Sequence, residues 1–564
     1  MSASGKLKVV LCWHMHQPQY RDLISGQYSL PWTYLHAIKD YADMAAHLEA
    51  VPTARAVVNF APLLLEQLDD YVRQIDAYLA GGTAMRDTLL AALVQLPAGD
   101  EARRRLIQDC LRVNEQRVIQ RFPAFARIAA LAREALDQPA IFEYLGDAFF
   151  SDLVMWYHLA WLGETVRRER PRVRALQDQS ARYSADDRHE LLALIGELVR
   201  GIVPRYRRLA KHGQVELSVT PYAHPIMPLL LDFQSTYDAM PDAKLPLRHS
   251  YPGGAERVRW HIQEGIATFE RHFGFKPAGC WPSEGSVSDA TLKLLDESGF
   301  AWAASGETVL TNSLHKSGHA PHAMKAAWLY RPYQVDGGHS ACFFRDDSLS
   351  DLIGFTYAKW HADDAVANLI QHLQNIAETC REHPDRIVSI ILDGENAWEY
   401  YPENGYYFLS ALYQRLAAHP HIALTTYSDY LKDHPPHPIK TIAAGSWVYG
   451  TFSTWIGDSE KNRAWDMLGE AKQAFDRAAS QLGSEQRAAA TRQLAVCEGS
   501  DWFWWFGDYN PESAVSDFEQ LYRLHLSNLY RLLRLEPPEY LFRPFTQGAG
   551  RPVHGGTMRP GQAS

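Results

Sequence analysis

The sequence predicts a parallel α/β protein in which buried strands alternate with helices around a barrel. Short, nearly continuous apolar runs, typical of strands covered on both faces, recur along the chain. They lie at residues 8–13, 56–60, 215–220, 279–281, 301–304, 342–344, 387–392 and 421–426. Segments with helical spacing, such as 257–273 and 290–298, separate several of these runs. Strands that alternate with helices over several hundred residues favour a parallel sheet, here a (β/α) barrel.

Composition and charge narrow the class of protein. The 564 residues are 46% hydrophobic and 22% charged, an ordinary globular balance, and carry a net charge of −10. This charge gives no general attraction to phosphate backbones, so we expect no nucleic-acid partner. No apolar run reaches the about 18 residues that a membrane span needs, so we expect no membrane partner. The N-terminus shows no signal-peptide pattern, and the expected location is the cytoplasm.

Cysteine and aromatic usage add two further points. The six cysteines are scattered and form no C-x-x-C pair, which argues against a zinc knuckle or a disulfide framework. Aromatic residues are abundant, with 16 Trp, 28 Tyr and 22 Phe. Flat amphipathic rings suit sugar faces and interfaces, but a large aromatic core would also use them. Composition leaves both interpretations open.

The chain divides into a barrel, an insertion, a helical region and a tail. Residues 1–435 are predicted to form the barrel, interrupted at about 63–200 by a helical insertion rich in Arg, Glu, Ala and Leu. After residue 435 the strand–helix alternation stops. We expect residues 436–546 to be helical and to complete a cleft at the barrel mouth. The Gly-, Pro- and Arg-rich segment 547–564 is predicted to be disordered.

Polar side chains follow four of the predicted strands, at the point where each strand ends. In chain order they are His14 and His16, Glu284, Arg345 and Asp346, and Asp393 and Glu395. The C-terminal ends of barrel strands converge on one face, where active sites are built. We therefore expect these side chains to lie close together.

Glu284 and Asp393 are the candidate catalytic pair. Two carboxylates on one concave face are what glycoside hydrolysis requires, because one attacks the anomeric carbon and the other protonates the departing oxygen. Taken alone, Glu284 sits in a common Ser-Glu-Gly turn, and residues 393–396 could be a helix-capping turn. Taken together, the two segments favour a sugar-cleaving site.

The histidines and a strand carboxylate are the next candidates. His14 and His16 are two residues apart on an extended segment, so their side chains point the same way. They could bind a metal or hydrogen-bond a substrate. Glu216 lies inside a strand pattern, where an unpaired carboxylate is costly. We expect Glu216 to hydrogen-bond a polar neighbour such as one of these histidines.

Four segments resemble glycoside hydrolase family 57, whose members include α-amylases, amylopullulanases, 4-α-glucanotransferases and branching enzymes. These segments are His16-Gln17-Pro18, residues 213–220, Trp281-Pro282-Ser283-Glu284-Gly285-Ser286 and residues 392–399. The resemblance covers residue 7 to about residue 541. It implies an incomplete (β/α)7-type barrel followed by helices, with Glu284 as the nucleophile and Asp393 as the acid/base. It also implies retention of anomeric configuration with no cofactor and no metal.

Within this family the chain is most similar to the amylopullulanase and α-amylase branch. The similarity rests on residues 344–346, 445–447, 454–457 and 498–505. It implies a glycosidase acting on α-1,4 linkages of glycogen, starch or maltodextrin, with α-1,6 cleavage left open. The side chains expected to contact the substrate are His14, His16, Gln17, Glu216, Trp281, Arg345, Asp346, Glu395, Trp398, Trp455, Asp501 and Trp504.

Three alternatives remain at this stage. A 4-α-glucanotransferase or branching enzyme shares the glycosyl-enzyme intermediate and differs only in the acceptor. A zinc-dependent deacetylase or mannosidase would use His14, His16 and an aspartate, although no third ligand is evident from spacing. A non-catalytic glucan-binding protein would have no need for the Glu284 and Asp393 pair. The catalytic pair does not determine which glycosidic linkage is cleaved, nor whether the enzyme hydrolyses its substrate or transfers it to another sugar.

Overall fold

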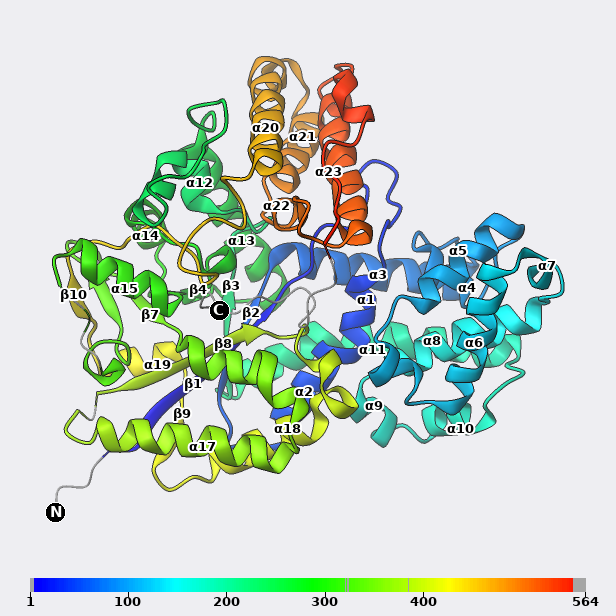
Figure 1. Cartoon of the computed structure of the whole chain (residues 1–564), viewed down its shortest axis with the longest axis horizontal. Helices are drawn as coiled ribbons and strands as arrows, with labels where there is room; N and C mark the ends of the chain where they lie inside the picture. The colour runs from blue at the N-terminus through cyan, green and yellow to red at the C-terminus, as the bar shows by residue number, and fades with distance from the viewer. Residues whose placement is uncertain (1–4, 320, 322–323, 384, 551–564) are drawn as a thin grey trace.

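The computed structural model describes residues 5–319, 321, 324–383 and 385–550 (Figure 1). Its sheet has the strand order β10-β6-β7-β5-β4-β3-β2-β1-β8, with β9 also paired to β1. The named strands pair in parallel except β6 with β7. The strands are β1 (Leu7–Met15), β2 (Ala56–Phe60), β3 (Val215–Val219), β4 (Gly279–Cys280), β5 (Trp302–Ser305), β6 (Tyr333–Val335), β7 (Ala341–Phe344), β8 (Ile387–Asp393), β9 (Ile422–Leu424) and β10 (His437–Ile439).

Seven of these strands curl into a barrel that is closed at one point. The run β7-β5-β4-β3-β2-β1-β8 supplies the wall. Arg345, directly after β7, forms a single parallel bridge with Ser389 in β8. The Asp346 N–H donates to the Ser389 carbonyl at 2.8 Å. Because β7 and β8 meet only at this bridge, the prediction of an incomplete (β/α)7-type barrel is confirmed.

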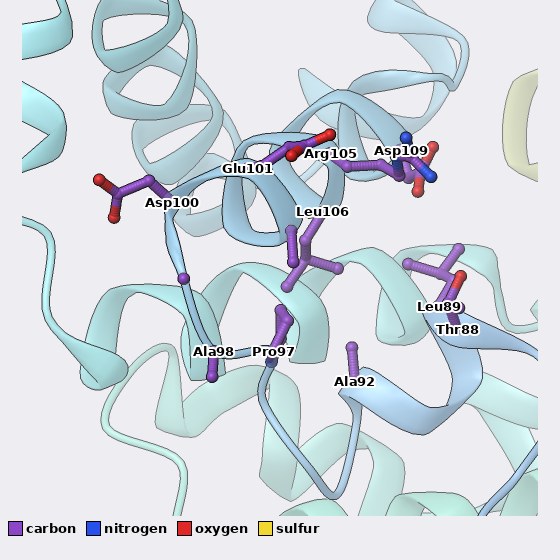
Figure 2. A pocket seen from close by; sticks show the side chains of 12 residues that line it. Thr88, Leu89, Ala92, Pro97, Ala98, Asp100, Glu101, Arg105, Leu106 and Asp109 are labelled. Carbon is purple, nitrogen blue, oxygen red and sulfur yellow. The ribbon is translucent and has the colours of Figure 1, made fainter.

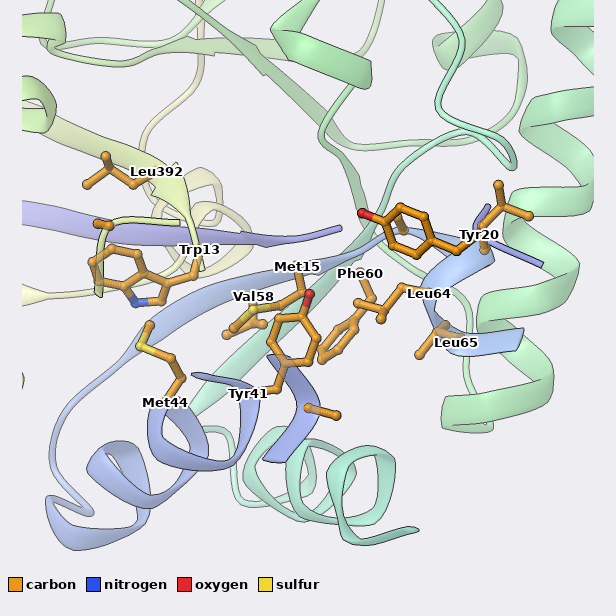
Figure 3. Close-up of a cluster of buried hydrophobic side chains, with 14 of the residues drawn as sticks. Trp13, Met15, Tyr20, Tyr41, Met44, Val58, Phe60, Leu64, Leu65 and Leu392 are labelled. Atoms are coloured by element: carbon orange, nitrogen blue, oxygen red, sulfur yellow. The ribbon is translucent and has the colours of Figure 1, made fainter. Parts of the chain in front are cut away.

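The strands separate an inner core from an outer core. Val10 and Cys12 of β1 belong to the cluster inside the barrel, together with Trp281 and Trp302. Trp13 and Met15 belong to the outer cluster, and Figure 3 shows them packed with side chains of β2 and of the helices that cover it. Successive residues of a strand point to opposite faces. His14 therefore points inward, on the same side as Cys12 and at the C-terminal end of β1.

Helices cover the outside of the barrel. Those that flank the strands are α1 (Trp32–His36), α2 (Ala42–Ala50), α12 (Met227–Leu231), α13 (Gly254–Phe273), α14 (Asp289–Glu297), α15 (Glu307–Lys316), α16 (Asp347–Asp351), α17 (Ala362–Thr379) and α18 (Tyr406–Ala417). The short helix α19 (Tyr427–Leu431) instead contributes Tyr427 and Tyr430 to the inner core. A π-helical turn, η1 (Ala37–Tyr41), joins α1 to α2. The outer faces of the strands are thus buried as the continuous apolar runs require.

The helical insertion lies between β2 and β3 and forms the right-hand lobe of Figure 1. It contains α3 (Pro62–Gly81), α4 (Thr88–Ala92), α5 (Asp100–Leu111), α6 (Pro123–Asp137), α7 (Pro139–Phe142), α8 (Asp147–Trp161), α9 (Glu164–Glu169), α10 (Pro171–Gln179) and α11 (Ala185–Lys211). The last of these begins with a capping box, in which Ser184 and Asp187 satisfy each other's backbone N–H groups. This helix ends at Lys211, four residues before β3.

The C-terminal helices stand above the barrel in Figure 1. They are α20 (Ser459–Ala478), α21 (Ser484–Cys497), α22 (Asp501–Trp505) and α23 (Glu512–Leu532). Of the predicted tail, residues 551–564 lie outside the described residues. The Ala549 and Gly550 N–H groups donate to the carbonyls of Asp508 and Asn510. None of the helices in the described part of the chain combines the length and the apolarity that a membrane crossing requires.

A buried carboxylate joins the C-terminal region to the barrel. Glu498 accepts hydrogen bonds from Arg257 at 2.8 Å and from Tyr251 at 2.6 Å, and its Oε2 lies 2.7 Å from His261 Nε2. Burial alone would raise the pKa of Glu498, but Arg257 and His261 outweigh it and hold the pKa at about 2. Arg257 and His261 lie on α13 beside the barrel. Residues 499–501 therefore start from a fixed point next to the barrel mouth.

Candidate active site

His14 is fixed at the end of β1 by its neighbour in β2. Its Nδ1 lies 2.7 Å from Asn59 Oδ1, and the two residues are paired in the strand register. With the oxygen of Asn59 facing it, Nδ1 carries the ring proton and Nε2 keeps its lone pair. This Nε2 faces Nε2 of His224 at 3.2 Å. Burial, and next the electrostatic effect of the neighbouring His16, lower the pKa of His14 to about 3, so the His14 ring is neutral.

His16 and Gln17 connect the first strand to two acidic residues. His16 Nε2 lies 2.7 Å from Asp501 Oδ1, a contact between β1 and α22 that spans most of the chain. The amide of Gln17 and the backbone N–H of His16 donate to Glu395 Oε1 at 3.3 Å and 3.4 Å. Burial, followed by the charge of Asp393, raises the pKa of Glu395 well above its usual value. Glu395 therefore holds a proton more firmly than an exposed glutamate.

His224 is the functional candidate that the sequence did not single out. It follows β3 with a φ of 58°, in the left-handed region that non-glycine residues rarely adopt. Its backbone carbonyl accepts from the Ser500 N–H at 2.9 Å, and its Nδ1 lies 2.7 Å from Ser500 Oγ. Its ring stacks on His16 at 3.8 Å between centroids. Only the polarity after Pro221 could have indicated this position.

Glu284 stands just past the two-residue strand β4. Its backbone is also left-handed, with a φ of 57°. Trp447 holds it twice: Nε1 donates to Glu284 Oε2 at 3.0 Å, and the Trp447 N–H donates to the Glu284 carbonyl at 3.1 Å. Glu284 Oε1 lies 4.0 Å from His224 Nδ1. Strained backbone of this kind persists only where several contacts fix it, and it clusters at functional sites.

Gly279 allows β4 to pass beside the indole of Trp302. A Cβ at this position would lie 1.8 Å from the Trp302 ring, which is fully buried inside the barrel. Only a residue without a side chain fits there. The close approach fixes the position of the strand that leads into Glu284.

Asp393 is the last residue of β8 and belongs to the same end of the barrel. Asn396 donates to its Oδ2 at 2.8 Å. Burial raises the pKa of Asp393, and the Asn396 hydrogen bond with the charges of His16 and Arg345 offsets only part of this effect. A carboxyl group with a raised pKa is suited to donate a proton near neutral pH.

Two series of contacts place Glu284 and Asp393 around one mouth. Glu284 contacts Trp447, whose ring lies 5.0 Å from the Arg345 guanidinium, and that cation in turn acts on Asp393. On the other side, Glu284 approaches His224, whose ring stacks on His16, and His16 also acts on Asp393. The strand-end residues are therefore brought together as the barrel topology predicts.

Glu216 corrects one prediction. It shares an inward-facing layer with Cys12 and Val57, whereas His14 pairs with Asn59 two residues further along the strands. This places Glu216 about 7 Å below the histidine layer, from the rise along a strand. Its carboxylate accepts from Trp302 Nε1 at 2.7 Å and from Ser428 Oγ at 2.5 Å. The prediction that Glu216 hydrogen-bonds a polar neighbour is therefore confirmed, whereas the suggested histidine partner was wrong. The carboxylate joins β3 to β5 and α19 below the site.

Several predicted contact residues are buried under the mouth. Trp281, Trp398 and Trp455 are at most 1% exposed. Trp398 Nε1 donates to the Gly394 carbonyl at 2.9 Å and thereby supports the turn after Asp393. Asp346 caps α16 by accepting from the Leu349 N–H at 2.9 Å.

Trp504 and Arg345 are two further residues that were predicted to contact the substrate. Trp504 is half-buried beside Trp455, with 5.8 Å between ring centroids. Arg345 is buried and forms ion pairs with Asp347 at 3.1 Å and with Asp351 at 2.6 Å. Trp504 is thus partly open to solvent, and the Arg345 guanidinium lies against the Trp447 ring.

Three histidines form a group that could hold a metal ion. One ring nitrogen from each of His14, His16 and His224 lies within 4.8 Å of one from each of the others. In the zinc-enzyme alternative, an aspartate was expected to join His14 and His16 as the third ligand, but the spacing of the sequence identified none. In the fold, His224 provides a third imidazole.

A separate pocket of about 490 Å³ lies in the helical insertion (Figure 2). Its lining residues come from α4, α5 and the loop between them, and include Leu89, Leu106 and Arg105. Burial raises the pKa of Asp109, at its edge, to about 6 although Arg112 opposes this shift. None of the barrel-mouth residues described above lines this pocket, so we assign the candidate site to the barrel mouth.

Comparison with known proteins identifies the class of this barrel. Similar solved structures include branching enzymes from Thermococcus kodakaraensis (TM-score 0.54, 17% identity, 96% of this chain and 95% of that one) and Pyrococcus horikoshii (TM-score 0.57, 15% identity, 99% and 100%). An α-amylase from Thermotoga maritima has a TM-score of 0.55 at 14% identity, covering 94% and 96%. The fold is that of these barrel enzymes. No curated protein sequence matches the chain significantly.

The family model of glycosyl hydrolase family 57 matches residues 10–443. Because this is more than half of the chain, the protein belongs to glycosyl hydrolase family 57. The resemblance inferred from four short segments is thus confirmed, and the chain is a glycoside-active enzyme.

The Asn396 hydrogen bond gives a prediction about pH dependence. Replacing Asn396 with Ala removes a donor that stabilises the Asp393 carboxylate, so the pKa of Asp393 should rise further. If Asp393 must be protonated for activity, the alkaline limb of the kcat/KM profile should move to higher pH. An Asn375→Ala variant, which changes an exposed asparagine on α17, should leave the profile unchanged. An alkaline limb that stays in place or moves to lower pH would contradict this assignment.

Proposed function

We propose that this enzyme is a retaining glycosidase that acts on α-glucans by double displacement. The observation that carries the proposal is the joint placement of Glu284 and Asp393 around the mouth of a family 57 barrel, linked through Trp447, Arg345 and the histidines. The similar structures named as branching enzymes and as an α-amylase support an α-glucan as the substrate. All six cysteines are free and buried, which suits a reduced, cytoplasmic setting.

The proposed reaction assigns one step to each carboxyl group. In the first step, the Glu284 carboxylate attacks the anomeric carbon while Asp393 gives its proton to the departing glycosidic oxygen. The C–O bond to the leaving sugar breaks as a glycosyl ester to Glu284 forms. In the second step, the Asp393 carboxylate removes a proton from an incoming hydroxyl, whose oxygen displaces Glu284. Two displacements at one carbon retain its configuration.

The surrounding side chains hold these groups in place. Trp447 orients Glu284 through its indole N–H. We propose that His14, His16, Gln17 and Asp501 contact the sugar, and that Trp504 extends the cleft for longer chains. Trp455 and Trp281 are fully buried, and we propose that they support the site from below. Burial raises the pKa of Glu395 as it does that of Asp393. Glu395 accepts hydrogen bonds from the Gln17 side chain and the His16 backbone N–H, which favours a positioning role.

Product analysis on maltoheptaose and pullulan tests the activity. We expect an amylase- or amylopullulanase-like hydrolase, in which each bond cleaved gives one new reducing end. Release of maltotriose from pullulan would add α-1,6 cleavage. A 4-α-glucanotransferase or branching enzyme would redistribute chain lengths or create branches with no net gain of reducing ends. That result would contradict the proposed hydrolase and assign a transferase activity instead.

Glu284→Gln tests the nucleophile. The amide has nearly the same shape but cannot form the glycosyl ester, so kcat should fall by several orders of magnitude while glucan binding survives. Glu270→Gln changes an exposed carboxylate on α13 and serves as the matched control. Near-normal turnover by Glu284→Gln would exclude Glu284 as the nucleophile.

Asp393→Asn and Glu395→Gln together test the acid/base. Loss of general acid catalysis should slow cleavage of natural glucans by about 10²–10⁴-fold. A substrate with an activated leaving group needs little protonation and should be affected much less. We expect this selectivity from Asp393→Asn. If only Glu395→Gln shows it, the roles of the two residues are reversed.

A further inference from the structure

The contact between His14 and His224 brings two ring nitrogens face to face inside the barrel mouth. Their Nε2 atoms face each other at 3.2 Å, while each Nδ1 is within 2.7 Å of an oxygen, Asn59 Oδ1 or Ser500 Oγ. When both Nδ1 atoms carry the ring proton, two lone pairs point at one another. A cation between the nitrogens would stabilise this arrangement; without one, His224 can accept from the Ser500 hydroxyl at Nδ1 and donate its Nε2–H to His14. A tetrahedral zinc ion, with Zn–N bonds of about 2.0–2.1 Å, separates two ligand nitrogens by about 3.3 Å.

His16 offers the third nitrogen. Its Nε2 is bound to the Asp501 carboxylate at 2.7 Å, and its Nδ1 is buried with no hydrogen-bond partner in the described part of the chain. A histidine that binds metal through one nitrogen almost always donates the other N–H to a carboxylate, a carbonyl or water. The candidate ligand nitrogens lie within 4.8 Å of one another. Binding by all three requires the His16 ring to turn out of its stacked position on His224, so that its lone pair points to the same centre.

We propose that His14, His16 and His224 form a binding site for a divalent transition-metal ion of the zinc type, and that this ion inhibits the enzyme. Three imidazoles select Zn²⁺, Co²⁺, Ni²⁺ or Cu²⁺ over Mg²⁺ and Ca²⁺, which prefer oxygen ligands. His224 Nδ1 is 4.0 Å from Glu284 Oε1. A cation on these rings therefore lies next to the proposed nucleophile and draws its negative charge away from the substrate.

Metal binding and inhibition are separate claims. Binding rests only on the three histidines and the residues that hold them. Inhibition rests in addition on the proposed function of Glu284. A spectroscopic measurement on the full chain therefore tests the site whatever the enzyme acts on.

The experiment uses the chelator-treated full-length protein titrated with Co²⁺ and then with Zn²⁺. Tetrahedral Co²⁺ gives intense visible absorption, whereas Co²⁺ in water or at scattered surface histidines does not. We expect the bands to saturate at one equivalent and to disappear when Zn²⁺ displaces Co²⁺. His224→Asn removes one imidazole and retains a residue type that tolerates a positive φ. His14→Gln provides a second variant in case the first does not fold.

The matched control is His419→Asn. His419 and His421 form another pair of histidines two residues apart, near the protein surface, with 6.1 Å between ring centroids. Wild type and His419→Asn should bind alike, and His224→Asn and His14→Gln should lose the visible bands. Asp501→Asn should weaken the affinity for Zn²⁺ about 10–100-fold, as expected for a partner of a ligating histidine. Bands that are absent in wild type, or equal in all variants, would overturn the site.

Glucan turnover provides the second readout. The chelated enzyme should remain active, one equivalent of Zn²⁺ should lower the rate, and a chelator should restore it. Activity that needs Zn²⁺ would overturn the inhibitory role and would favour the metal-dependent alternative instead. Absence of glucan activity in every condition, with the Co²⁺ bands intact, would refute the proposed function and leave the metal site standing.

Discussion

The buried Glu498 carboxylate is the contact on which the shape of the barrel mouth depends. It binds Arg257 and His261 of α13 and Tyr251 near the start of that helix, and lies two residues before Ser500. Removing one partner of such a buried ion pair typically destabilises a protein by about 3–5 kcal/mol, because a charge is left without compensation. Ser500 and Asp501 in turn hold His224 and His16. Two residues at the start of α22 thus help to hold the histidines of the candidate site.

Backbone strain at the mouth is the second organising feature. Glu284 and His224 both have left-handed backbones, at a typical cost of about 1–3 kcal/mol each. Both are held on two sides: Glu284 by two bonds from Trp447, and His224 by the backbone and side chain of Ser500. Trp447 and Ser500 come from the segment that follows the last barrel helices. These contacts from the later part of the chain hold the two strained residues with His224 Nδ1 and Glu284 Oε1 4.0 Å apart.

The sequence predicted the elements whose signal is local. Continuous apolar runs identify buried strands such as β1 and β8, and polar residues at their ends identify Asp393 and Glu284 as neighbours. The histidine partner of Glu216 was predicted wrongly because the layer of an inward-facing residue depends on strand register, here the pairing of β3 with β2 and β4. His224 was missed because a single histidine after a strand carries no pattern. Its partner Ser500 is 276 residues away, and only the folded chain brings them together.

The charges around the mouth are paired in a way that suits an uncharged substrate. The Arg345 guanidinium is bound by Asp347 and Asp351, and the Asp501 carboxylate by His16. Burial keeps His14 neutral and raises the pKa values of Asp393 and Glu395. Apart from the Glu284 carboxylate, little net charge is left to attract an ionic substrate. Hydroxyl groups, which exchange hydrogen bonds with such a site without bringing charge into it, are the substrate chemistry that this arrangement accommodates.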